Sequence, residues 1–163
     1  MKPASLAQIR KELKYLSEDQ LRELCLRLAR FKIDNKELLT YCLFESENEE
    51  SYVAAISDYI DTSFEEINTK NYYYIKKSIR KILRQLRKFI RYSGKKETEF
   101  LIHLKFAQAL LELNPSIFNN NSLTKLYLRE IQILKSTLKK LHEDLQFEYN
   151  IELSNLLNKS NKF

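Results

Sequence analysis

The chain has 163 residues, of which 44% are apolar and 31% charged, and its formal net charge is +6. One Gly and two Pro are too few for the turns of a β protein or the crossovers of an α/β protein, and the chain lacks the long polar tract of a disordered protein. The sequence therefore predicts an all-α protein with the size of one domain.

Caps and apolar spacing mark the expected helices in chain order. Ser5 precedes apolar residues at helical spacing, and Ser17 opens the second helix as part of a capping box. Asp34 is expected to open the third helix in the same way, and Ser122 to cap the last long helix. Gly94, the chain's one glycine, is typical of a C-terminal cap.

These signals predict about seven helices in a bundle or an irregular array of antiparallel helical hairpins. The expected helices span residues 6–15, 18–31, 35–44, 51–68, 71–93, 96–113 and 122–148. We expect residues 1–150 to form a single helical domain and residues 151–163 to form a partly frayed C-terminal tail.

The long helix expected at residues 122–148 carries a heptad pattern. Its alternating a and d positions are Tyr127, Ile131, Leu134, Leu138, Leu141 and Leu145. Such a stripe packs either inside the protein's own bundle or against the same helix of a second copy. The sequence leaves both interpretations open, so a homodimer built on this helix is one prediction.

Charge is distributed unevenly along the chain. Residues 37–69 hold nine acids and no base, whereas residues 70–96 hold eleven bases and no acid. Residues 1–36 have a net charge of +4, and residues 97–163 are balanced. The modest net charge therefore hides a separation of charge between two neighbouring helices.

The helix at residues 71–93 gathers its positive charge on one side. At about 100° per residue, its apolar side chains cover one arc and its bases another. Tyr73 lies within the basic arc, with Tyr74 and Tyr92 at its edge. The basic arc consists of Lys76, Lys77, Arg80, Lys81, Arg84, Arg87, Lys88 and Arg91.

Two partners and one passive role fit this arc. Each pair of like charges four residues apart destabilises the helix by about 0.2–0.5 kcal/mol before screening. An unmixed basic face is therefore typical of a surface that meets a polyanion, such as nucleic acid or an acidic protein. A solvated basic face is the passive alternative. The acids of the preceding helix, among them Asp58, Asp61 and Glu65, are expected to point away and to neutralise the arc only in part.

Three segments give the chain a resemblance to a known family: "LKYLSEDQLRELCLRLARFKIDNKELLTYCLFE", "IDTSFEEINTKNYYYIKKSIRKILRQLRKFIRYSGKKETE" and "LHEDLQFEY". Over nearly its full length, the chain resembles an all-helical bacterial family that is a domain of unknown function. The resemblance implies a stand-alone bacterial protein of the cytosol. It implies no activity, ligand or site residue.

The residues that most often carry chemistry form no catalytic or metal-binding pattern. Cys25 and Cys42 fall at apolar helical positions, which predicts thiols in the core of a protein from a reducing compartment. His103 lies in a strongly apolar helix and is expected in the core or at its boundary. His142 has acidic neighbours, but they lie on other sides of the helix. We therefore expect no catalytic residue, metal or other cofactor.

These observations predict a non-enzymatic helical interaction protein that contacts a polyanion, such as nucleic acid, through the basic side of the helix at residues 71–93. The alternative is a protein–protein scaffold or a homodimer that uses the heptad helix. The N-terminus has no signal-peptide pattern, and no apolar stretch reaches the length of a membrane span. These absences predict a cytoplasmic protein without a membrane partner.

Overall fold

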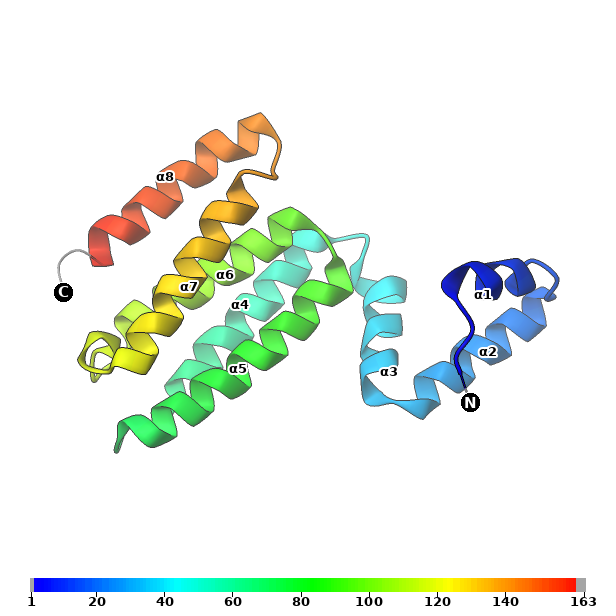
Figure 1. Ribbon diagram of the computed structural model, residues 1–163, viewed down its shortest axis with the longest axis horizontal. Helices are drawn as coiled ribbons and strands as arrows, with labels where there is room; N and C mark the ends of the chain where they lie inside the picture. The colour runs from blue at the N-terminus through cyan, green and yellow to red at the C-terminus, as the bar shows by residue number, and fades with distance from the viewer. Residues whose placement is uncertain (1, 161–163) are drawn as a thin grey trace. The chain divides into compact units, whose positions relative to one another are not determined.

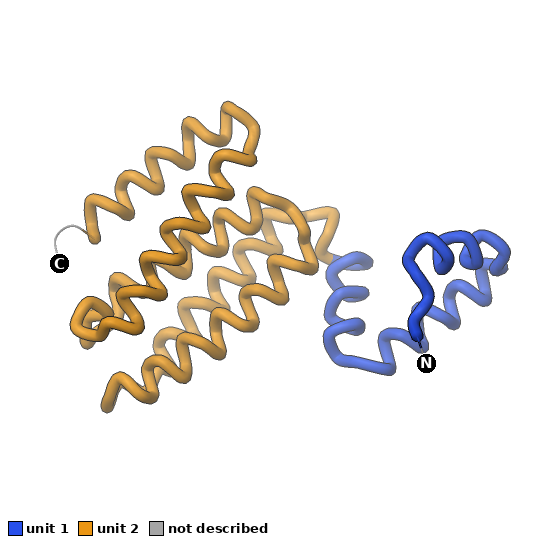
Figure 2. The backbone as a smooth tube through the Cα atoms, in the orientation of Figure 1, with its two compact units in different colours: residues 1–44 blue, residues 45–163 orange. Residues whose placement is uncertain are grey.

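The computed structural model describes residues 2–160 and confirms the all-α class. In that part of the chain there are eight α-helices and no strand. The chain divides into two compact units, residues 1–44 and residues 45–163 (Figure 2), where the sequence predicts one domain. Each unit is described by itself below.

The first unit consists of three short helices followed by a π-helical turn. They are α1 (Leu6–Leu13), α2 (Glu18–Phe31), α3 (Ile33–Thr40) and η1 (Tyr41–Glu45), the last of which reaches the second unit. Two predicted caps are confirmed: the Ser5 hydroxyl accepts from the backbone N–H of Gln8, and the Ser17 hydroxyl accepts from that of Gln20. Both form complete capping boxes.

The predicted cap at Asp34 is wrong. Helix α3 begins at Ile33, so Asp34 lies in its first turn, and the N-cap residue is Lys32, whose side chain makes no capping bond. The reason is the short connection. Lys32 alone, in an extended conformation, joins α2 to α3, and the Asn35 side-chain amide donates to the backbone oxygen of Leu28 over 2.9 Å.

The prediction of core cysteines is also wrong, since Cys25 and Cys42 are both exposed. The reason lies in the size of the first unit. Three short helices enclose too little volume for a core, and α1, α2 and α3 contain no buried residue. Helical apolar spacing in α2 therefore does not predict burial.

The second unit contains five α-helices and one 3-10 turn (Figure 1). They are α4 (Glu49–Glu65), α5 (Tyr72–Ser93), α6 (Lys96–Glu112), η2 (Ile117–Asn119), α7 (Asn121–Leu138) and α8 (Glu143–Ser160). Helix α6 is central: it contacts α4, α5, α7 and α8 and holds nine buried residues. Asn48, Asn71 and Asn120 cap α4, α5 and α7 through their side-chain oxygens.

The predicted cap at Ser122 is therefore wrong. The Asn120 side chain accepts from the backbone N–H of Leu123, so α7 begins at Asn121 and Ser122 lies in its first turn. Asn is as effective an N-cap as Ser, and "NNNS" offers both at adjacent positions.

The single long helix predicted at residues 122–148 is two helices. After Leu138 the chain tightens into a turn, in which Lys140 N–H donates to Thr137 O over 2.9 Å and Leu141 N–H donates to Leu138 O over 3.1 Å. Helix α8 then runs back alongside α7 (Figure 1). Leu141, in the turn, is buried.

The heptad side chains pack within the protein. Five of the six are buried in the second unit and Leu145 is half-buried, which supports the intramolecular interpretation of the pattern; the buried ones are Tyr127, Ile131, Leu134, Leu138 and Leu141. These positions form no exposed seam for a second copy.

Helix α8 continues through most of the segment predicted to fray. Residues 151–160 are helical, and Leu153 and Leu156 are buried. Tyr149 fixes the helix further, because its ring stacks on Phe100 with 5.0 Å between centroids and its hydroxyl donates to Glu97 over 2.7 Å. Residues 161–163 of the predicted tail lie outside the described residues.

Among the helices formed by residues 2–160, none combines the length and the apolar character that crossing a membrane requires.

The predicted cap at Gly94 is confirmed and gives a test of the fold. Gly94 has φ +67°, and a Cβ there would meet nothing within 4 Å. Its replacement therefore affects only the backbone conformation. We expect Gly94→Ala to lower the free energy of unfolding by about 1–2 kcal/mol in urea titrations. Gly94→Asn should lower it less, because Asn tolerates the left-handed region. Equal stability of the Ala variant and the parent would contradict this account of the cap.

Candidate polyanion-binding surface

Helix α5 presents an apolar side to the core and a basic side to solvent. Ile75, Ile79, Ile82, Leu83 and Leu86 are buried, as the predicted apolar arc requires. The predicted basic arc, called the basic face below, lies opposite. Six of its residues are exposed and Lys76 and Lys88 are half-buried; the exposed ones are Lys77, Arg80, Lys81, Arg84, Arg87 and Arg91.

Two hydrogen bonds from tyrosine hydroxyls hold α5 in this orientation. Tyr52 of α4 donates to the backbone oxygen of Phe89 over 3.1 Å, and Tyr72 in the first turn of α5 donates to that of Ser116 over 2.8 Å. Tyr73 instead stays 66% exposed beside the basic face. Of the three consecutive tyrosines 72–74, Tyr72 therefore packs within the unit, whereas Tyr73 and Tyr74 are exposed.

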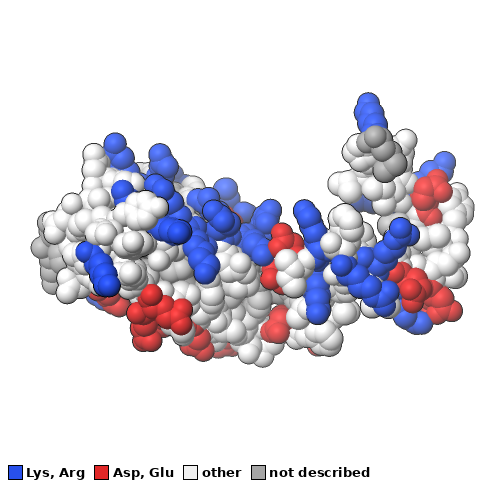
Figure 3. Space-filling model, turned by 90° about the horizontal axis from the view of Figure 1, so that it is seen from below, with Lys and Arg blue, Asp and Glu red and all other residues white. Residues whose placement is uncertain are grey.

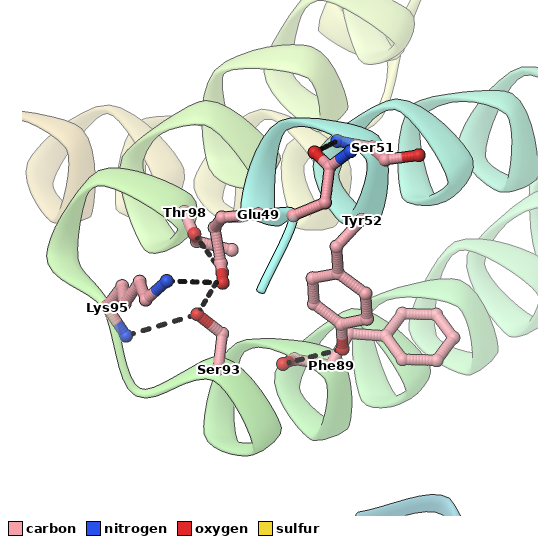
Figure 4. A network of polar contacts seen from close by, with 8 residues as sticks. Glu49, Ser51, Tyr52, Phe89, Ser93, Lys95 and Thr98 are labelled. Carbon is pink, nitrogen blue, oxygen red and sulfur yellow. Dashed lines mark hydrogen bonds and ion pairs between the residues drawn. The ribbon is translucent and has the colours of Figure 1, made fainter. Parts of the chain in front are cut away.

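The acidic segment is engaged elsewhere. Asp61 pairs with Lys105 of α6, with 2.7 Å between its Oδ2 and Nζ. Glu49, at the start of α4, accepts from Thr98 Oγ1 over 2.6 Å and from Ser93 Oγ, and pairs with Lys95 Nζ over 2.8 Å (Figure 4). These contacts fasten α4 to the turn between α5 and α6.

The basic face consequently keeps most of its charge. Apart from Lys88, none of its side chains forms an ion pair or hydrogen bond with a residue in the described range 2–160. Within the larger unit, Lys and Arg side chains gather along one edge, and most visible acids lie on the opposite edge (Figure 3). Partial neutralisation of the basic face by residues 45–66 stays a prediction.

A groove of about 830 Å³ runs between α5 and α7. Arg80, Arg84 and Arg87 line it from α5, and Lys125 and Arg129 line it from α7. Its remaining lining includes four apolar residues, Leu83, Leu123, Leu126 and Ile133. The groove thus has basic walls and an apolar floor. We refer to it as the α5–α7 groove.

The contribution of α7 is missing from the sequence prediction. Lys125 and Arg129 belong to residues 97–163, where acids and bases balance, so segment charge gives no signal there. The available signal is their spacing of four residues, which places both on one side of a helix. Which side faces α5 depends on the packing of α7 against α6.

A buried hydrogen-bonded pair of side chains lies behind the groove. His103 Nδ1 of α6 and Glu130 Oε2 of α7 are 2.6 Å apart, and the residues are 4% and 1% exposed. The predicted core position of His103 is confirmed, whereas its partner is not foreseen by the sequence. Glu130 is the one acid that lines the groove within residues 2–160, and its carboxylate is bonded to His103 rather than exposed to a ligand.

Comparisons with protein-family models, with curated proteins and with solved structures found no match for the chain. The family resemblance drawn from the sequence stays a prediction. Within residues 2–160, no three His, Cys, Asp or Glu side chains lie together in a way that would hold a metal ion.

The His103–Glu130 pair gives a stability test, because each residue is the other's buried partner. His103→Leu and Glu130→Leu should each lower the free energy of unfolding by about 1–3 kcal/mol by leaving a polar group unpaired. The double variant should cost less than the sum of the two, since it removes both groups. Chemical unfolding measures the coupling energy. Glu112→Leu, at an exposed glutamate of α6, is the control for a change of Glu to Leu. If the cost of the double variant equals the sum of the two single costs, the coupling is ruled out.

Proposed function

We propose that this protein is a non-enzymatic, cytoplasmic interaction protein whose basic face binds the phosphate backbone of nucleic acid. The observation that carries the proposal is the row of basic side chains on α5 which, apart from Lys88, form no ion pair with an acid in residues 2–160. Such a row repels itself. The phosphates of a polyanion neutralise it, and the counterions that they release favour binding.

The shape of the basic face favours nucleic acid over an acidic protein. From Lys76 to Arg91 the helix extends about 22 Å at 1.5 Å per residue, and its bases repeat on nearly every turn. A phosphate backbone supplies negative charges at a regular spacing over that length. An acidic protein would need an equally long and regular row of carboxylates. Binding to phosphates carries no sequence information, so we expect tolerance of sequence and strong sensitivity to salt.

A charge-reversal variant tests the proposal. Arg80→Glu, Arg84→Glu and Arg87→Glu together should weaken binding to a labelled oligonucleotide at least about tenfold in fluorescence anisotropy at low salt. The variant should also flatten the dependence of log K on log salt, because each lost phosphate contact removes about 0.7–0.9 from the slope. Arg80, Arg84 and Arg87 are exposed, so the fold should tolerate the changes.

The matched control changes net charge equally at another surface of the same unit. Lys135, Lys139 and Lys140 are exposed, and they do not line the α5–α7 groove. Their combined change to Glu should leave most of the affinity in place. Equal losses in both triple variants would reduce the effect to net charge and contradict a defined site. Binding of an acidic polypeptide without binding of nucleic acid would favour the acidic-protein alternative.

A further inference from the structure

The α5–α7 groove has the size of a site for one strand. Its volume of about 830 Å³ falls within the range of about 300–1,000 Å³ that accommodates small ligands. That volume is comparable to a few nucleotides of one chain. Basic side chains from α5 and α7 line opposite walls, so a single phosphate backbone inside the groove would be within reach of both helices.

The floor of the groove offers contacts that a phosphate backbone cannot use. Leu126 and Ile133 are only half-buried, and they lie among the cations that line the groove. In a duplex the faces of the bases are hidden in the stack, whereas a single strand exposes them to apolar and aromatic side chains. An apolar floor between basic walls therefore suits a strand with unpaired bases.

Tyr73 adds an aromatic surface next to the groove. A shallow depression of about 500 Å³ is lined by Tyr73 and by basic-face residues, and it shares Lys76, Arg80 and Arg84 with the α5–α7 groove. Asn71 holds the first turn of α5, since its side chain accepts from the backbone N–H of Tyr73 over 3.0 Å. The Tyr74 ring packs edge-on against the Tyr73 ring, with 5.4 Å between centroids. Tyr73 is thus an exposed ring on a fixed helix end, surrounded by positive charge.

On the basis of the proposed function, we propose that the ligand is single-stranded nucleic acid. Its backbone contacts Arg80, Arg84 and Arg87 on one wall and Lys125 and Arg129 on the other. Its bases lie over the apolar floor, and one base stacks on Tyr73 next to the shared cations. The site is therefore a groove built from two helices, not the surface of α5 alone.

The test compares a labelled oligothymidylate with a blunt-ended hairpin duplex that carries the same number of phosphates. Fluorescence anisotropy at one fixed salt concentration should show tighter binding of the single strand by about tenfold, the equivalent of one stacked base. Tyr73→Ala should remove most of this preference and leave binding of the duplex unchanged, whereas Tyr73→Phe should keep it because the ring remains. Tyr15→Ala, at a 75% exposed tyrosine of the first unit, should have no effect.

Helix α7 is tested by the exposed pair Lys125 and Arg129. Their combined change to Glu should weaken binding of the single strand at least about fivefold, more than the same change at Lys135 and Lys139. Circular dichroism of each variant verifies its fold.

The outcomes separate the two proposals. Equal affinity for the single strand and the duplex, with no effect of Tyr73→Ala, would overturn the single-strand inference and leave the proposed function standing. Unchanged binding after the Lys125 and Arg129 substitutions would remove α7 from the site and overturn the groove. Binding of neither nucleic acid would overturn both proposals.

Discussion

The burial of α6 is the constraint on which the larger unit depends. Its sequence "FLIHLKFAQALLEL" is apolar almost all round, and a helix of that kind is stable only when other helices cover it. Helices α4, α5, α7 and α8 do so. Phe100, Phe106, Ala107 and Leu110 are completely buried as a result. The hydrophobic gain from α6 thus decides where the four surrounding helices lie.

This arrangement also fixes the direction of the charge on α5. Because the apolar side of α5 is buried against the core, its bases face solvent whatever the electrostatic cost. Relief by the acidic segment is limited, since Glu49 and Asp61 form their closest contacts with Ser93, Thr98 and two lysines outside the basic face. The field of the basic face is therefore a consequence of core packing.

The sequence predicts what depends on one helix at a time. The two sides of α5 follow from periodicity, and the caps at Ser5, Ser17 and Gly94 follow from residue type. The turn after Leu138 contains neither Gly nor Pro, so no local signal marks the end of α7. The packing of α8 back onto the bundle determines where the turn lies.

Features that depend on the packing of two helices cannot be predicted from the periodicity of either helix alone. The α5–α7 groove exists because α5 and α7 both lie against α6, and its second wall comes from a segment without net charge. The partnership of His103 with Glu130 joins residues 27 positions apart, and nothing in either local pattern indicates it. The exposure of Cys25 has the same origin, since an apolar face is buried only when a neighbour covers it.

Helix α7 packs against the core and also lines the α5–α7 groove, and these two roles leave no heptad seam for a homodimer. Its heptad side, including Tyr127, Ile131 and Leu134, is buried in the bundle, and this packing turns Lys125 and Arg129 toward α5. The same residues therefore cannot also serve as the seam of a homodimer without dismantling the groove. All residues that line the α5–α7 groove belong to the second unit, which holds the core. The packing of that core therefore keeps the two basic walls in place relative to each other.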